Sequence, residues 1–181
     1  MTFEPDGTFE PDGALEPAGS IERDGAGEAS SFTWTDEAGP VQLEESAALR
    51  ALEAALAHGG HADRVVDVIV VGKSSLAEMH GQFLGDPSET DVITFDLADD
   101  EGMGGPDGEI YISADRAREV SADRDVPVSR ELALYVVHGA LHLCGMDDHA
   151  DEDRARMRVA EAQVMASLGY SEDRAPHDLA D

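Results

Sequence analysis

The chain has 181 residues, and 40 acidic against 12 basic residues give it a formal net charge of −28. This length suits one ordinary domain, and no apolar run approaches the roughly 20 residues needed to cross a bilayer. Nucleic-acid-binding proteins normally carry a basic surface, so the charge argues against RNA binding in dilute buffer. At molar salt the Debye length falls to about 3 Å, and an acidic surface then repels RNA little.

The N-terminus lacks the basic and apolar segments of a secretion signal. The single cysteine, Cys144, has no partner for an internal disulfide, which suits a reducing compartment. We therefore expect a cytoplasmic protein with no membrane segment, in which Cys144 is a small buried apolar side chain.

The chain opens with a short repeat. Residues 2–7 (Thr-Phe-Glu-Pro-Asp-Gly) recur as residues 8–13, and the pattern then decays. Four short units are too few to build a stacked core, and residues 1–30 carry eight acidic residues against one basic residue. We predict a disordered acidic tail over 1–30, one domain over 31–170 and a loose tail over 171–181.

Periodicity divides the domain into alternating strands and helices. The strongest strand, 64–72, is β-branched almost throughout and is expected to be central. Ser74, Ser75 and Ser129 are candidate helix N-caps. In chain order we predict strand 31–35, helix 43–58, strand 64–72, helix 74–84, strand 90–96, loop 99–108, strand 109–113 and helices 114–122, 131–144 and 151–168. This order predicts a single α/β (α+β) domain, in which helices cover a mixed sheet of about four strands.

Three of the seven histidines fall between His138 and His149, at and after the end of a predicted core helix. His138 and His142 are four residues apart, so their side chains share one helix face and can bind one ion. Gly145 can end the helix in a left-handed conformation and return Asp148 or His149 toward them. Two helical imidazoles and a third ligand from the next turn are typical of catalytic zinc, whose fourth position holds water.

Residues 138–145 (His-Gly-Ala-Leu-His-Leu-Cys-Gly) match the signature of the YbeY family of bacterial metallo-endoribonucleases, His-Gly-x-Leu-His-Leu-x-Gly-Tyr-Asp-His. Residues 90–95 and 108–112 also resemble elements of that family. One extra acidic residue precedes the last histidine here, so the family's third ligand falls on Asp148 by position and on His149 by residue type. We prefer His149, because imidazole is the commoner zinc ligand, and keep Asp148 as the alternative.

The resemblance covers about residues 31–170 and implies a single-strand-specific endoribonuclease with one Zn²⁺ per chain. It implies a role in maturation of the 16S rRNA 3′ end and in ribosome quality control, with rRNA and the small ribosomal subunit as partners. Asp147 is a candidate to orient a zinc-binding imidazole. Many family members carry an arginine where this chain has Leu84, so no arginine role is carried over.

Two other hypotheses stay open. In metalloproteases of the His-Glu-x-x-His pattern the glutamate activates water, and this chain has Gly139 at that position. A ribosome-assembly module with a structural zinc would need a fourth protein ligand. For the nuclease, five cations are candidate phosphate contacts, although each also suits an ordinary solvated surface charge. They are Lys73, Arg116, Arg118, Arg124 and Arg130.

Overall fold

The computed structural model describes residues 29–98 and 105–170, so most of the two predicted tails and part of loop 99–108 lie outside the described residues. The predicted α/β domain with a four-stranded mixed sheet is confirmed. In chain order the elements are β1 (Ser31–Trp34), η1 (Asp36–Ala38), α1 (Glu45–Gly59), β2 (Val66–Val71), α2 (Lys73–Leu84), β3 (Val92–Asp96), β4 (Gly108–Ser113), α3 (Ala114–Arg124), α4 (Val128–Leu143) and α5 (Asp151–Ser167).

The strands form one sheet in the order β1-β2-β4-β3. β1 and β4 flank β2 in parallel, whereas β3 is antiparallel to β4 and forms an edge. Val68 is in register with Phe32 on one side and Ile110 on the other, so β2 is an inner strand, as its β-branched sequence predicts. The free edge of β3 borders the site described below.

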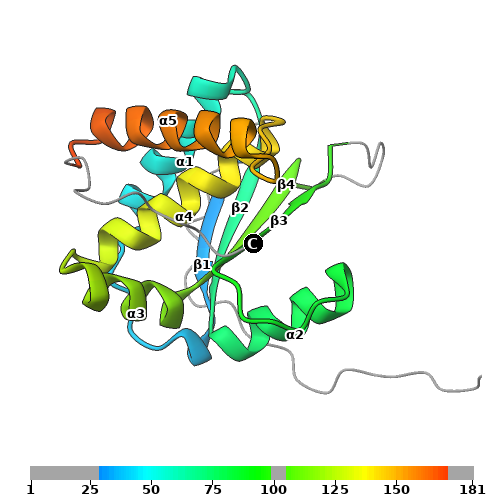
Figure 1. The fold of residues 1–181 in the computed structure, drawn as a ribbon, viewed down its shortest axis with the longest axis vertical. Helices are drawn as coiled ribbons and strands as arrows, with labels where there is room; N and C mark the ends of the chain where they lie inside the picture. Colours follow the sequence, from blue (N-terminus) through cyan, green and yellow to red (C-terminus); the bar gives the residue numbers. More distant parts are fainter. Residues whose placement is uncertain (1–28, 99–104, 171–181) are drawn as a thin grey trace, which may run out of the picture.

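Helices cover the two faces of the sheet unequally (Figure 1). α1 and α4 pack on one face with α5 outside them, and this side holds the main core, which includes Val68, Ile110 and Leu141. α2 covers the other face through a smaller cluster around Val71 and Leu76. Because α4 is buried almost throughout, each polar side chain on it needs a partner or a cleft.

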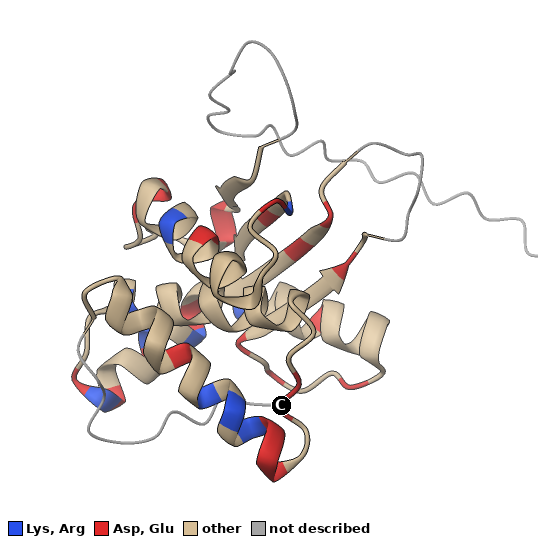
Figure 2. Cartoon of the chain, turned by 90° about the horizontal axis from the view of Figure 1, so that it is seen from above, with Lys and Arg blue, Asp and Glu red and all other residues tan. Residues whose placement is uncertain are grey.

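Acidic residues lie on most elements of the fold, whereas basic residues are fewer (Figure 2). On α5, Arg154 pairs with Asp151 and Arg156 pairs with Asp153, so these arginines do not form an unbalanced basic patch. In the two described stretches, no helix has the length and hydrophobicity of a bilayer-spanning segment.

Candidate metal centre

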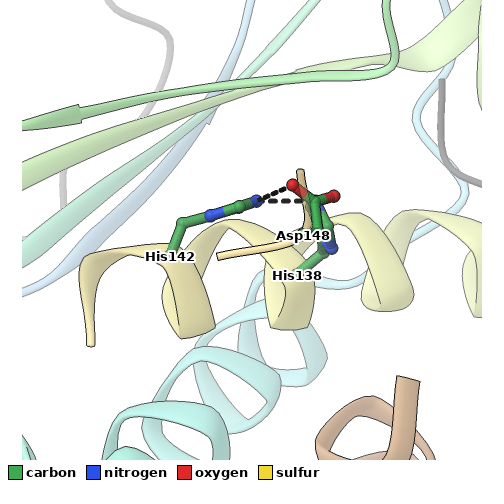
Figure 3. Close-up of side chains that lie close together, drawn as sticks. All are labelled: His138, His142 and Asp148. Carbon is green, nitrogen blue, oxygen red and sulfur yellow. Dashed lines mark hydrogen bonds and ion pairs between the residues drawn. The ribbon is translucent and has the colours of Figure 1, made fainter. Parts of the chain in front are cut away.

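His138 and His142 lie on one face of α4, with their rings nearly perpendicular (87°), ring centroids 4.5 Å apart and Nε2 atoms 3.0 Å apart. Gly145 follows with a φ of 81°, the left-handed conformation predicted for the helix end. The turn brings Asp148 back, with its carboxylate oxygens 3.7 Å from Nε2 of His138 and 3.8 Å from Nε2 of His142. Figure 3 shows the three side chains pointing toward one another.

The outer nitrogen of each ring is held by an acceptor. Nδ1 of His138 donates to Oε1 of Glu161 (2.7 Å), and Nδ1 of His142 donates to the carbonyl oxygen of Met146 (2.9 Å). Because a neutral imidazole carries a single proton, both Nε2 atoms then present lone pairs to each other. Burial lowers the pKa of His142, and the neighbouring His138 lowers it further, which favours the neutral ring.

The three side chains fit a divalent cation. Two neutral ring nitrogens and a carboxylate that face one another are stabilised by a positive charge between them, and a divalent cation supplies it without protonating either ring. A tetrahedral ion about 2.1 Å from its ligand atoms needs those atoms about 3.4 Å apart. The two nitrogens are 3.0 Å apart, and each has one Asp148 oxygen close to that spacing: Oδ2 is 3.7 Å from His138 and Oδ1 is 3.8 Å from His142. Among the described residues this group offers three donors, which is typical of catalytic sites with an open position.

The structure places Asp148, the alternative third donor, and not the preferred His149, beside the two helix histidines. The His149 side chain is 84 % exposed, and its Nδ1 faces Asp147 (3.3 Å) and Asp148 (3.4 Å) rather than the helix histidines. The Asp148 side chain is 14 % exposed and turns inward. The extra acidic residue in the turn shifts the histidine one place along the sequence, to an exposed position. His149 still lines the same cleft.

Asp147, the residue predicted to orient an imidazole, bonds the backbone of its own turn. Its carboxylate accepts the backbone N–H groups of His149 (3.1 Å) and Asp148 (2.7 Å), and these two bonds lower its pKa. Asp147 thus shapes the turn that carries Asp148. The carboxylate that orients a helix imidazole is Glu161 instead.

Glu161 was missed from sequence because it lies on α5, 23 residues after its partner His138. It is only 6 % exposed and shares the buried face of α5 with Met157 and Val164. A carboxylate on the apolar stripe of an amphipathic helix is unusual, since buried charges are normally paired. That pattern was a signal that could have been used.

Arg64 ties the end of α4 to the sheet. Its guanidinium, in a side chain that is 11 % exposed, donates to the carbonyl oxygens of Leu143 and Asp107 and to the carboxylate of Asp96. The hydrogen bond from Arg64 lowers the pKa of Asp96. Because Leu143 directly follows His142, this contact holds the helix turn that carries the second histidine.

The three donors open into a cleft of about 510 Å³ along the free edge of β3. Its walls come from the end of α2, from β3, from the last turns of α4 and from the turn after it. Among the described residues that line it, none is Lys or Arg. The volume lies within the usual range for small-ligand pockets.

The five cations predicted as phosphate contacts do not line this cleft. Arg118 donates to the carbonyl oxygens of Ala38 and Pro40, and Arg130 pairs with the buried Glu131 at 3.0 Å. These two side chains therefore stabilise the fold, and the contact of the five cations with phosphate stays a prediction for a surface outside this cleft. The five lie at the start of α2, on α3 and at the start of α4: Lys73, Arg116, Arg118, Arg124 and Arg130.

Gly139 disfavours the protease hypothesis for a steric reason as well as a chemical one. A Cβ atom at this position would lie 2.5 Å from Cγ2 of Ile110 in β4 and 3.1 Å from the hydroxyl of Thr94 in β3. α4 therefore packs too closely on the sheet to accept a glutamate directly after His138. Both the base and the space for it are missing at this position.

Comparison with known proteins gives one consistent family. Residues 34–169 match the family model described as Endoribonuclease YbeY. A protein of that name from Symbiobacterium thermophilum is 35% identical over 138 residues, which cover 72% of this chain and 87% of the relative. Another from Bacillus licheniformis is 34% identical over 149 residues, covering 76% and 94%. Among solved structures, the solution structure of a Thermotoga maritima protein aligns with a TM-score of 0.47 at 23% identity, covering 76% of this chain and 96% of that one.

Proposed function

The chain belongs to the YbeY family of endoribonucleases, and from this premise we propose that it is a metal-dependent endoribonuclease centred on His138, His142 and Asp148. The observation that supports this best is the meeting of two Nε2 atoms and an inward carboxylate in an open cleft. We propose zinc as the ion, because imidazole nitrogens and carboxylate oxygens are donors that zinc commonly accepts.

The proposed reaction is hydrolysis of a phosphodiester bond in single-stranded RNA. When bound, a divalent ion supplies Lewis-acid stabilisation of charge on a phosphoryl oxygen and activates water near neutral pH. His138 and His142 contribute neutral nitrogen donors, and Asp148 contributes a negative charge. Glu161 and Met146 hold the two rings in place, so the donors are arranged before the substrate arrives.

We further propose ribosomal RNA as the substrate class. The family resemblance implies maturation of the 16S rRNA 3′ end and ribosome quality control, in the cytoplasm and in contact with the small ribosomal subunit. The name shared by the relatives, Endoribonuclease YbeY, supports an endoribonuclease, and cleavage of a 16S precursor tail tests the choice of ribosomal RNA.

Two histidine substitutions test the proposed activity. His142→Ala is expected to lose the bound ion and to abolish cleavage of a 16S precursor tail, because one of three donors is gone. His58→Ala, at an exposed position on α1, is the matched control and is expected to keep both. The activity would be refuted by a folded His142→Ala protein that cuts as fast as the unmodified chain.

A second pair of substitutions tests the third donor. Asp148→Asn keeps the side-chain size but removes the charged oxygen donor, so bound metal measured by atomic absorption should fall well below one ion per chain. His149→Ala should retain the ion, because this exposed imidazole contacts Asp147 and Asp148 rather than the helix histidines. If His149→Ala loses the ion and Asp148→Asn keeps it, His149 is the third ligand.

A further inference from the structure

Helix α2 carries an apolar stripe that continues past the part of the sheet it covers. Leu76 and His80, one turn apart, are 0% and 7% exposed and face the sheet. Phe83 and Leu84, on the next turn of the same face, are 62% and 63% exposed. The described residues therefore leave the end of this stripe largely uncovered, although its side chains are large and apolar.

The uncovered end borders the metal cleft. Leu84 and His80 line the same cleft as His138 and His142. Nδ1 of His80 donates to the carbonyl oxygen of Ser88 (3.1 Å), so the other ring nitrogen is an acceptor when the imidazole is neutral. The α2 wall of the cleft thus offers apolar surface together with a polar ring.

The ring of Phe83 is held in place. It meets the ring of Phe95 in β3 edge to face, with centroids 5.1 Å apart and an interplanar angle of 71°. Phe95 in turn meets Tyr111 of β4 at 5.8 Å and 82°. Such a contact holds an aromatic ring in place, and because Phe83 is still 62% exposed, it offers apolar ring surface for stacking.

The charges of the cleft determine which part of an RNA can be held there. Asp91, Asp96 and Asp148 line it, and its described lining residues include no Lys or Arg. Phosphate groups away from the metal ion therefore find no positive partner among them. Stacking of a base on an aromatic ring needs no opposite charge and suits an acidic cleft.

We propose that Phe83 and Leu84 form a binding site for an unpaired nucleobase of the RNA substrate, beside the phosphate that is cut. This inference rests on the proposed function and deepens it. Proteins commonly bind single-stranded RNA by stacking splayed bases on aromatic side chains. A base inside a duplex has both faces covered by its neighbours, so the site selects single strands.

Binding to a short single strand tests the proposal. Fluorescence anisotropy of a labelled oligoadenylate of about 12 nucleotides is measured on His142→Ala protein, which should not cut it. Adding Phe83→Ala is expected to weaken binding about tenfold, and Phe83→Trp to preserve it. Val159→Ala, at a residue that is 57% exposed on α5, is the matched control and should change nothing. In the active protein, with His142 intact, Phe83→Ala should raise the KM for RNA cleavage about tenfold as well.

An abasic oligonucleotide separates stacking from general apolar contact. Removing one base at the bound position should weaken binding to the Phe83 protein about tenfold, and Phe83→Ala should add no further loss there. The proposal is overturned if Phe83→Ala protein binds the intact oligonucleotide as tightly as its parent. It is equally overturned if Phe83→Ala weakens binding by the same factor for every abasic oligonucleotide as for the intact one. It is also overturned if Phe83→Ala changes the sedimentation of the protein alone, since a second copy then covers the patch. Absence of cleavage by the unmodified chain would refute the proposed function, while the binding comparison still reports on Phe83.

Discussion

At the scale of single residues, the metal centre depends on which ring nitrogen carries the proton. The acceptors Glu161 and Met146 hold the Nδ1 protons of His138 and His142, so both Nε2 atoms are free to bind an ion. A backbone carbonyl cannot be removed by substitution. Glu161 can, and it is therefore the residue through which this arrangement is best tested.

Glu161→Gln is expected to weaken zinc binding about 10- to 100-fold, the usual effect of losing a carboxylate behind a ligating histidine. The substitution keeps the size of the side chain and removes its charge. Competition with a fluorescent zinc chelator measures the affinity. Glu152→Gln, at an exposed position on the same helix, is the control. Equal zinc affinities for the two variants would contradict the role given to Glu161.

Asp96 should make a pH-dependent contribution to stability. Arg64 lowers the pKa of Asp96 below its usual 3.8, so the folded state favours the carboxylate. The contribution is therefore present above the unfolded-state pKa and is lost as the pH falls through the lower, folded-state pKa. Because the Asp96 side chain is 58% exposed, Asp96→Asn should lower the free energy of unfolding at neutral pH by less than about 1 kcal/mol. Urea unfolding over a pH series measures this, and a difference that persists in strong acid would contradict it.

The pair His138 and His142 was predictable because the spacing of four residues is a local property of a helix. The choice between Asp148 and His149 was not, since it depends on how the turn after the helix returns. Glu161 comes from another helix, and only packing of α5 on α4 brings it to the site.

At the scale of elements, the hydrophobic pattern of the sequence predicts the strands and helices. The residue at which a helix begins can depend on groups from distant parts of the chain. The predicted N-cap at Ser129 is wrong, because α4 begins at Val128 and Pro127 occupies the capping position. Ser74 does not cap α2 either: the first N–H of that helix, from Lys73, donates to the carboxylate of Asp115 in α3 (3.0 Å). A cap supplied by another helix leaves no local sequence signal.

Replacing glycine by alanine should have opposite effects on stability in α4, which packs closely on the sheet, and in α2, where the glycine has room. Gly139→Ala should destabilise the fold by about 1–3 kcal/mol, because its Cβ would lie 2.5 Å from Ile110. Gly81→Ala on α2 meets only Pro87 at 3.4 Å, so the higher helix propensity of alanine should add up to about 1 kcal/mol. Denaturant unfolding of both variants measures the difference. If Gly139→Ala is as stable as Gly81→Ala, the packing described here is wrong.

At the scale of the whole molecule, the sheet order places the site. The metal helix packs against β3, which is an edge strand, and the cleft therefore stays open along one side. The number of strands and their mixed character followed from the order of elements in the sequence. The order β1-β2-β4-β3 did not, because it arises from pairing between segments far apart in the chain.

The net charge of −28 predicts an unusual response to salt. Raising KCl from about 0.05 to about 1 M should increase the Tm, because screening relieves repulsion among acidic groups. Each 1 kcal/mol of relief corresponds to about 2–4 °C. Affinity for single-stranded RNA should not fall over the same range, since stacking rather than basic side chains holds the substrate. A steep loss of affinity with salt would indicate basic phosphate contacts elsewhere on the chain.

The central claim concerns the ion, and its coordination sphere is the most direct measurement. Anomalous scattering at the zinc edge, from crystals of the zinc-loaded full chain, should locate one ion. We predict that it is bound by Nε2 of His138, Nε2 of His142 and a carboxylate oxygen of Asp148, with its remaining side open to the cleft. Absence of an ion between these residues, or an ion held by His149 with Asp148 turned away, would contradict the account.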